Sequence, residues 1–452
     1  MARQRLGSGF ARLWTAGAIS NLGDGVALAA LPLLAASLSG SPTTVAAVAA
    51  AGALPWLLFS LVGGAIADRT DRRRTMAVVD TFRFAAMGLL AIALAADVAT
   101  IGLLIIVSFA LGTAETVFDN ASQALLPSVV AEDRLETANG RLEGAQIVAN
   151  QFVGPPLGAW LFAVAAAAPF ALDAATFLAA AGLVLLLRGS FRPTRDLATT
   201  TVRGDIAAGL RWLFAHRLLR SLAIALGIMN MVGMAAMAIL VLYARRVLHL
   251  GDVEYGFLLT AEAAGAVLGS MVAAAVSSRF GAGRTLTLAI LGAAASFLIP
   301  ALWAQPVAVA FALALGGCAG LIWNIITVSL RQTLVPDVLL GRVNSAYRMI
   351  GWGTMPVGAL LGGLLADAFG LRAPFLVAGV ISLGLAFWTT TTVTTRSIER
   401  ARRRARWTEE QAGPGNEPVI DLTILEAGPV PIVDLRDPAP ERDAGQRPSG
   451  AR

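Results

Sequence analysis

Acidic side chains inside apolar stretches are the residues of this sequence that could do chemistry. Asp24 lies near the middle of a long apolar segment, and Glu115 and Glu262 interrupt two others. An ionised carboxylate at the centre of a bilayer costs at least about 2.5 kcal/mol, so such a group is expected to face a polar path. We predict that these three carboxyls, Asp24 first, carry protons across a membrane. The alternative is a neutral Asp24 hydrogen-bonded to helix backbone beside Gly23 and Gly25.

Further polar residues suit ion pairs or a substrate path. Asp80 and Arg83 are three residues apart, so they share a helix face, and we expect an ion pair near the cytoplasmic interface. Glu143 and Arg348 enter the fifth and eleventh predicted spans and are candidate gate residues. Asp173 is a further candidate for the path or for a helix cap. The candidates to line a substrate path are Asn21, Asp119, Trp323 and Trp352.

No pattern typical of an enzyme is present. No Walker loop can form because the sequence contains no lysine, which excludes ATP-driven transport by this chain. No catalytic triad or metal-binding cluster stands out, and the single cysteine, Cys318, lies in an apolar stretch where it is expected to pack. We therefore expect no enzymatic activity, no cofactor and no metal site.

The composition is that of a membrane protein. Of the 452 residues 56% are hydrophobic and only 14% are charged, against roughly 25% charged residues in soluble proteins, and the mean hydropathy is +0.70. A sequence pI near 10.7 would suggest nucleic acid as a partner of a soluble protein. Basic residues collect on the cytoplasmic side of membrane proteins, however, so we expect membrane lipids and no nucleic acid.

The apolar stretches that lie between the charged segments predict an all-α protein with twelve transmembrane helices. About 20 apolar residues cross a bilayer core of roughly 30 Å. The first apolar segment is too long for a cleaved signal peptide. The Arg-rich segments alternate with Arg-free loops, which predicts a multi-pass plasma-membrane protein with both termini cytoplasmic. The predicted spans are 10–38, 44–67, 76–96, 98–118, 140–163, 167–188, 221–244, 256–278, 285–303, 307–330, 342–366 and 373–395.

An internal repeat divides the spans into two sets of six. Gln123-Ala-Leu-Leu-Pro127 follows the fourth span and Gln332-Thr-Leu-Val-Pro336 follows the tenth, and each leads into a span with a Gly/Pro patch. Transporters are often built from such repeats. The predicted units are a six-helix half at 1–188, a cytoplasmic middle loop at 189–220, a second six-helix half at 221–395 and a basic, then disordered, tail at 396–452.

The loop after the second span reads Gly64-Ala-Ile-Ala-Asp68-Arg69-Thr-Asp71-Arg72-Arg73-Arg74. With the 6+6 layout, it resembles the signature loop of the major facilitator superfamily, although Asp71 stands where that loop usually has glycine. The resemblance implies that Asp68 meets the start of the eleventh span, which offers Arg342, and that this latch holds the outward-facing state. The residues of the predicted latch are Gly64, Asp68, Arg69, Asp71, Arg72, Arg73 and Arg342.

A second resemblance concerns direction of transport. Gly154, Pro155 and Gly158 of the fifth span resemble the core of the antiporter motif of facilitator exporters, although Asn150 and Ala159 replace customary glycines. The basic residue that these proteins carry in the fourth span is missing here. The start of the chain, the signature loop and the turn after the tenth span are similar to those of macrolide and siderophore exporters.

Together these features predict a secondary active efflux transporter, working by alternating access as a proton antiporter of a lipophilic small molecule such as a drug, siderophore or secondary metabolite. Movement of lipids or lysolipids is the first alternative. A membrane sensor or scaffold that acts through its tail, with an unknown protein partner, is the second. The sequence leaves open the substrate, proton or sodium coupling, and the oligomeric state.

Overall fold

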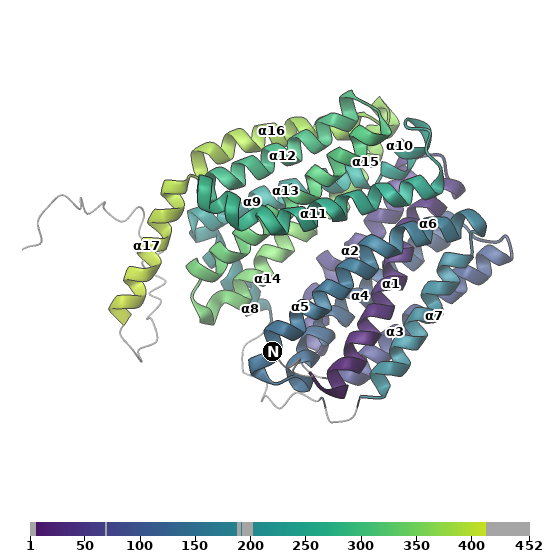
Figure 1. The fold of residues 1–452 in the computed structure, drawn as a ribbon, viewed down its shortest axis with the longest axis horizontal. Coiled ribbons are helices and arrows are strands. Elements are labelled where there is room, and N and C mark those ends of the chain that lie inside the picture. Colours follow the sequence, from purple (N-terminus) through teal and green to yellow (C-terminus); the bar gives the residue numbers. More distant parts are fainter. Residues whose placement is uncertain (1–5, 68–69, 188–190, 192–201, 413–452) are drawn as a thin grey trace, which may run out of the picture. The chain divides into compact units, whose positions relative to one another are not determined.

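The computed structural model describes residues 6–67, 70–187, 191 and 202–412. Those residues form helices joined by short turns, and twelve helical segments are long and apolar enough to cross a membrane, which confirms the predicted all-α fold (Figure 1). Helices suit this composition because a chain in lipid must satisfy its backbone hydrogen bonds internally. The described residues up to Ala405 belong to one compact unit.

The helices are, in chain order, α1 (Gly7–Leu38), α2 (Pro42–Ala67), α3 (Arg72–Ala95), α4 (Ile101–Val129), α5 (Leu135–Gln146), the π-helical η2 (Ile147–Val153), α6 (Gly154–Val164), α7 (Ala168–Leu185), α8 (Val202–Ala215), α9 (Arg217–Met237), α10 (Leu240–Arg246), α11 (Asp252–Phe280), α12 (Ala282–Leu302), α13 (Pro306–Leu334), α14 (Asp337–Gly353), α15 (Met355–Phe369), α16 (Ala373–Thr392) and α17 (Thr395–Ala412). A single 3₁₀ turn, Glu132–Arg134, precedes α5.

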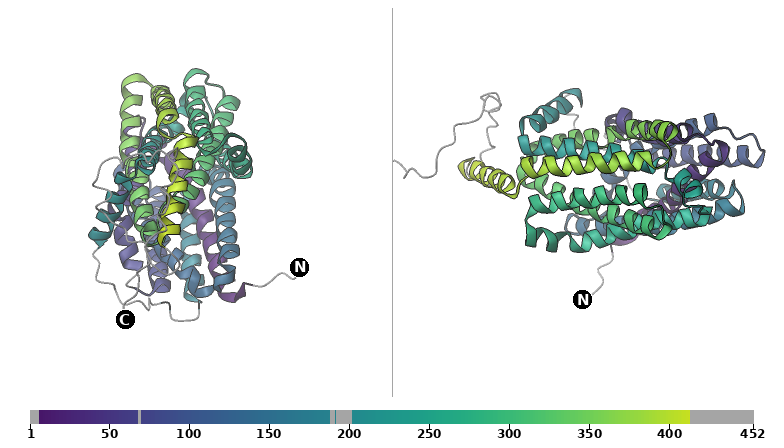
Figure 2. Two further views of the ribbon diagram at one scale, coloured as in Figure 1. Left: turned by 90° about the vertical axis from the view of Figure 1, so that its left-hand side faces the viewer. Right: turned by 90° about the horizontal axis from the view of Figure 1, so that it is seen from above.

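The two sets of six spans pack in the same way. In the first half α2 lies on α4, α3 on α7, and α1 on α6 and α7; in the second, α11 lies on α13, α12 on α16, and α9 on α15 and α16. The views of Figure 2 show the helices of both halves running side by side. Each pair in one half corresponds to the pair six spans later, so the repeat seen in the sequence is a repeat of packing.

The close approaches within each half depend on glycine. Gly158 of α6 lies against the backbone of Val26 in α1, and Gly362 of α15 lies against the backbone of Ala235 in α9. A Cβ at either glycine would overlap a carbonyl group, so only glycine allows these backbones to meet. The Gly/Pro patches thus hold equivalent helix pairs inside each half. They also lie at the interface between the halves, as the sequence suggested, because Gly363 meets the backbone of Thr43 in α2 and Gly256 of α11 meets that of Pro155.

The two halves meet through α2 with α15 and through α6 with α11. Asp367 in the last turn of α15 accepts a 2.9 Å hydrogen bond from the Thr43 backbone N–H and a 3.3 Å bond from the Ser41 hydroxyl. Its carboxylate therefore caps the N-terminus of α2 in the other half. At the opposite end α5 packs on α1, and α8 packs on α14, each within its own half.

Two elements differ from the prediction. The fourth span was predicted to stop at residue 118, but α4 continues to Val129. Glu115 and Asp119 lower the apolar character of the sequence there, although the helical hydrogen bonding continues. The predicted middle loop contains α8, whose Gly209 lies against the backbone of Arg342 at the start of the eleventh span.

Arginines of the predicted latch and of α1 complete helix ends. Arg73 donates a 2.7 Å hydrogen bond to the carbonyl of Leu187, and Arg12 donates one of the same length to Leu186, so both satisfy carbonyls just beyond the C-terminus of α7. Arg72 donates a 2.8 Å bond to the carbonyl of Ala124 in α4. Asp71, the departure from the signature, caps α3 by accepting a hydrogen bond from the Arg74 N–H.

Candidate functional site

Glycines bring three elements together around Asp24. Gly23 lies against the side chains of Asp173 and Thr176 of α7, where a Cβ would overlap both. Gly25 lies against the backbone of Asn150 in η2, which a Cβ would approach to 2.5 Å. Asp24 lies between these two glycines in the sequence. The segment of α1 that packs closely on α7 and η2 therefore also carries this acidic side chain.

Arg83 of α3 supplies the positive charge of this region. Its guanidinium carbon lies 5.0 Å from the centre of the Phe118 ring in α4 and 5.1 Å from that of Phe177 in α7, and the residue is 2% exposed. Aromatic faces attract a cation, and two of them fix the guanidinium plane. This buried arginine comes from the third span, next to the fourth span that lacks a basic residue.

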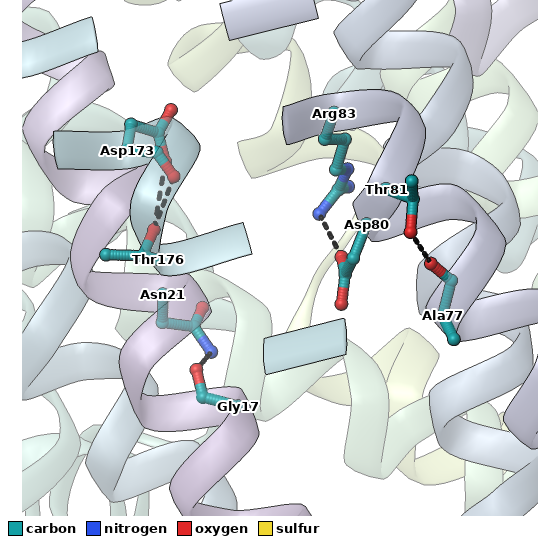
Figure 3. Close-up of polar contacts among 8 residues, drawn as sticks. All are labelled: Gly17, Asn21, Ala77, Asp80, Thr81, Arg83, Asp173 and Thr176. Carbon is teal, nitrogen blue, oxygen red and sulfur yellow. Dashed lines mark hydrogen bonds and ion pairs between the residues drawn. The ribbon is translucent and has the colours of Figure 1, made fainter. Parts of the chain in front are cut away.

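Four carboxylates lie within electrostatic range of Arg83. The residue pairs with Asp80 at 3.9 Å, one helical turn away, as Figure 3 shows. The others, Asp24, Glu115 and Asp119, reach the same guanidinium from α1 and α4. The ion pair predicted near the cytoplasmic interface is therefore part of a larger buried group. We name Asp24, Asp80, Arg83, Glu115, Asp119 and Asp173 the acidic cluster.

Several oxygens of the acidic cluster have no hydrogen-bond partner. Asp80 is fully buried, and within the described residues neither of its carboxylate oxygens accepts a hydrogen bond. Asp173 is also fully buried; its Oδ1 accepts from the Thr176 hydroxyl at 3.4 Å, but its Oδ2 is without a partner (Figure 3). Buried unpaired oxygens are costly, and they are the groups that a proton or another cation would satisfy.

An aromatic contact links the acidic cluster to the second half. The side chain of Trp56 in α2 lies beside that of Glu115. Its ring meets that of Trp352 in α14 edge-on, with centroids 4.5 Å apart and an interplanar angle of 88°. Arg348, one turn earlier in α14, lies over the Trp352 ring at 4.3 Å and within electrostatic range of Asp119. Charges of both halves therefore meet at this tryptophan pair.

Among the described residues, no set of carboxylates surrounds the buried Arg331 of the second half as it does Arg83. Asn230 of α9 donates a 2.8 Å hydrogen bond to the carbonyl of Gly351 in α14. Glu262 lies partly buried in α11 and, among the described residues, forms no ion pair. Arg331 is 8% exposed, bonds Asn344 at 2.9 Å and lies 3.9 Å from the centre of the Tyr347 ring.

The remaining predicted residues are not members of the acidic cluster, and two of them lie outside the described residues. Asn21 donates to the carbonyl of Gly17 within α1, at 2.7 Å (Figure 3). Trp323 is 6% exposed in the interior of the second half. Glu143 is exposed on α5 and makes no ion pair with Arg348. Asp68 and Arg69 of the predicted latch lie outside the described residues.

Sequence reasoning missed Trp56, Phe118 and Phe177. Phe118 stands beside Asp119 and three residues after Glu115, which places it on the acidic side of α4. That spacing could have identified it. Trp56 and Phe177 carry no comparable local signal because their contacts come from other helices.

Comparisons with known proteins identify the family of this chain. Residues 6–428 match the model of the family described as transmembrane secretion effectors of the major facilitator superfamily. The multidrug efflux pump Tap of Mycolicibacterium fortuitum is 30% identical over 373 residues, which cover 80% of this chain and 89% of that protein. The enterobactin exporter EntS of Escherichia coli is 26% identical over 339 residues, 72% of this chain and 78% of that protein.

Solved structures share the fold. The nucleoside transporter NupG aligns with a TM-score of 0.68 at 13% identity, over 85% of this chain and 99% of that one. A bacterial homologue of the human lysosomal transporter Spinster, inward-facing and unoccupied, aligns with a TM-score of 0.66 at 14% identity, over 89% and 99%. The chain is therefore a twelve-span efflux transporter that belongs to the transmembrane secretion effector family of the major facilitator superfamily.

Proposed function

We propose that this transporter exports a lipophilic small molecule in exchange for protons, and that the acidic cluster carries the protons. The observation that supports the proposal is the burial of Arg83 between two phenylalanine rings, with four carboxylates in its electrostatic range. One fixed cation cannot neutralise four acids. The excess carboxylates must bind protons when they are enclosed, and must release them when solvent reaches them.

The Ser41–Asp367 contact fits one state of an alternating-access cycle. It joins the halves at one end, while at the other end the main contacts of α5 and α8 are with helices of their own halves. We infer that the Arg-rich end is cytoplasmic, that the membrane is the plasma membrane and that both termini are inside. The structure then corresponds to the state closed to the outside. Exchange of protons for substrate would take place at the acidic cluster before the halves reorient.

The relatives suggest the substrate class. Tap is described as a multidrug efflux pump and EntS as an enterobactin exporter, so drugs and siderophores are the first compounds to test. The two tryptophan rings offer apolar surface between the halves, which favours an amphipathic or apolar compound over a sugar.

The experiment is efflux from cells that express the wild type, Asp24→Asn or Glu262→Gln, with and without a protonophore. Asp24→Asn removes the titratable group and keeps the size, so we expect export of a transported compound to fall to the level of cells without the protein. The protonophore should have the same effect on the wild type. Glu262→Gln is the matched control, a carboxyl of the other half that has no ion-pair partner among the described residues.

Export that survives both Asp24→Asn and the protonophore would refute proton coupling through this cluster. A second assay gives an independent readout: in proteoliposomes with an imposed pH gradient, adding substrate should release protons from the wild type and not from Asp24→Asn. Substrate movement that follows a sodium gradient would contradict the proposal. Transport of lysolipid in the same liposomes, with no drug or siderophore moved, would favour the lipid alternative.

A further inference from the structure

The helix α17 begins directly after the last membrane span, and its first turn is packed on the second half (Figure 1). Only Val393 and Thr394 separate it from the end of α16 at Thr392. The Thr394 hydroxyl accepts a 3.0 Å hydrogen bond from the Ser397 backbone N–H, which caps this turn. Ile398 in the same turn is 1% exposed. The start of α17 is therefore part of the packed protein.

Two glycines between α11 and α12 make room for the start of α17. Gly281 has a φ of +79°, and a Cβ there would lie 2.9 Å from the side chain of Thr395. A Cβ at Gly283 would overlap the backbone of Thr394 and Thr395. Only glycine lets these two backbones approach so closely. The first turn of α17 is thus held on the α11–α12 turn by a backbone contact.

Exposed arginines flank this contact in both segments. Arg279 lies in the last turn of α11 and Arg284 in the first turn of α12, and both are exposed. On α17, Arg396, Arg400 and Arg403 are also exposed. Their spacings of four and three residues place them on one face of the helix, opposite the buried Ile398. We name Arg279, Arg284, Arg396, Arg400 and Arg403 the arginine surface.

Little of this charge is neutralised within the protein. Glu399 is the only acid between Thr395 and Ala405. It lies 3.9 Å from Arg403, in a pair whose arginine and glutamate side chains are 81% and 55% exposed. An ion pair as exposed as this contributes little and leaves most of the arginine open to solvent. The arginine surface therefore keeps a positive charge that can attract an anionic partner.

Apolar side chains beside the arginine surface indicate that this partner is a lipid. Phe280 follows Arg279 directly and is 43% exposed, and Phe387, within the last two turns of α16, is 76% exposed. In a membrane protein such side chains face the acyl chains, so arginines at the helix ends reach the level of the headgroups. The anions at that level are phosphates, which a guanidinium binds through two parallel hydrogen bonds.

We propose that the arginine surface binds the phosphate headgroups of anionic phospholipids, and that Gly281 and Gly283 build this site by holding the start of α17 on the α11–α12 turn. Clusters of arginine close to a membrane span are attracted to anionic lipids in this way. The lipid site goes beyond the proposed function, because it requires neither proton coupling nor a particular exported compound.

The test is the binding of fluorescent phosphatidylglycerol to the purified full chain in a non-ionic detergent, measured by fluorescence anisotropy. The double variant Arg396→Gln, Arg400→Gln removes two charges from the surface and should weaken binding about tenfold or more. Binding of phosphatidylcholine with the same acyl chains should not change. Gly283→Ala keeps every arginine but pushes α17 off the turn, so it should weaken binding of phosphatidylglycerol about tenfold.

Two matched controls separate this site from a general effect of charge. The double variant Arg74→Gln, Arg141→Gln removes two exposed arginines from the first half. At about 0.15 M salt, where charges far from the lipid are screened, its affinity for phosphatidylglycerol should stay within about twofold of the wild type. Gly384→Ala adds a methyl group to α16 where no atom lies within 4 Å, and it should bind the lipid as the wild type does.

An unchanged affinity in Arg396→Gln, Arg400→Gln overturns the proposal, as does an equal loss in Arg74→Gln, Arg141→Gln. Inorganic phosphate that binds the wild type as tightly as phosphatidylglycerol does would identify a free anion as the ligand and refute the lipid site. Wild-type affinity in Gly283→Ala would refute the role of the glycine contact. Weaker lipid binding in the arginine variant, with export still sensitive to the protonophore, supports the lipid site and leaves the proposed function standing.

Discussion

The two halves of this transporter share one packing pattern but differ in the chemistry of their interiors. The first half encloses carboxylates from α1, α3 and α4 around Arg83, which is held between two phenylalanine rings. The second half encloses Arg331 against Tyr347, and its Asn230 donates a hydrogen bond to the carbonyl of Gly351. The glycine contacts of α6 on α1 are repeated by α15 on α9.

The difference indicates a division of work between the two halves: both have the same helix packing, but only the first supplies the buried acidic cluster. Duplication of the six-helix unit preserved the residues that let backbones meet, while the buried acids are concentrated in one copy. Movement requires both halves to be rigid bodies, but coupling to an ion requires titratable groups in only one of them. The four predictions below test this division, from the largest expected effect to the smallest.

Removing the buried arginine of the first half should have the largest effect. Arg83→Gln leaves several buried carboxylates without a cation, and breaking a buried charge group in this way costs about 3–5 kcal/mol. We expect loss of export and a lower thermal unfolding temperature in detergent. Arg331→Gln is the matched change in the second half, and we expect it to lower stability while export remains measurable. Equal loss of export in the two variants would contradict the division of work.

The glycine contacts should be equally sensitive in both halves. Gly158→Ala and Gly362→Ala each place a methyl group on a neighbouring carbonyl, and overpacking of this kind costs about 1–3 kcal/mol. Thermal unfolding followed by size-exclusion chromatography should show similar destabilisation for the two variants. Gly182→Ala is the control, since no atom lies within 4 Å of its added methyl group. A large difference between Gly158→Ala and Gly362→Ala would show that the packing is not truly repeated.

The contact between the halves should control the conformational equilibrium and leave each half intact. Asp367→Asn weakens the cap on α2, and a cap of this type is worth about 1 kcal/mol, or roughly a fivefold change in population. Cysteines placed at Thr44 and Leu364 in a Cys318→Ser background, labelled with spin probes, should report a larger share of the separated state. Asp97→Asn, in the turn after α3, is the matched control. An unchanged distance distribution would show that the cap does not hold this end closed.

The smallest effect is expected at the lone carboxyl of the second half. Glu262→Gln should alter the proton-to-substrate ratio by less than the error of a liposome flux assay, because Glu262 has no cationic partner like Arg83 among the described residues. A halved ratio would place a second proton carrier in the second half and would remove the asymmetry.

The sequence predicted the fold well because the membrane imposes it. A stretch of apolar residues long enough to cross the bilayer has one regular conformation available, so twelve such stretches predict twelve helices. The end of α4 and the presence of α8 were harder. Acidic residues interrupt the apolar sequence of α4 before the helix ends. The helix α8 is too short and too polar to be predicted as a membrane span.

The site was predicted only in part. Each acid of the cluster was identified, because a carboxyl residue within an apolar stretch can be recognised from the sequence alone. Their gathering around Arg83 was not, since spacing along α3 shows only the neighbour at Asp80. The rings of Phe118 and Phe177 come from α4 and α7, and only helix packing brings them to the guanidinium.

The π-helical turn η2 gives the fifth span a mechanical property that an uninterrupted helix lacks. One additional residue in that turn rotates everything before Ile147 by about 100° relative to α6. The turn lies against Gly25, and the carbonyl of Phe152 within it accepts a 3.5 Å hydrogen bond from Thr260 of the other half. Deletion of one residue from this turn would therefore rotate the Glu143 face of α5 by about the same angle around the helix axis, relative to α6.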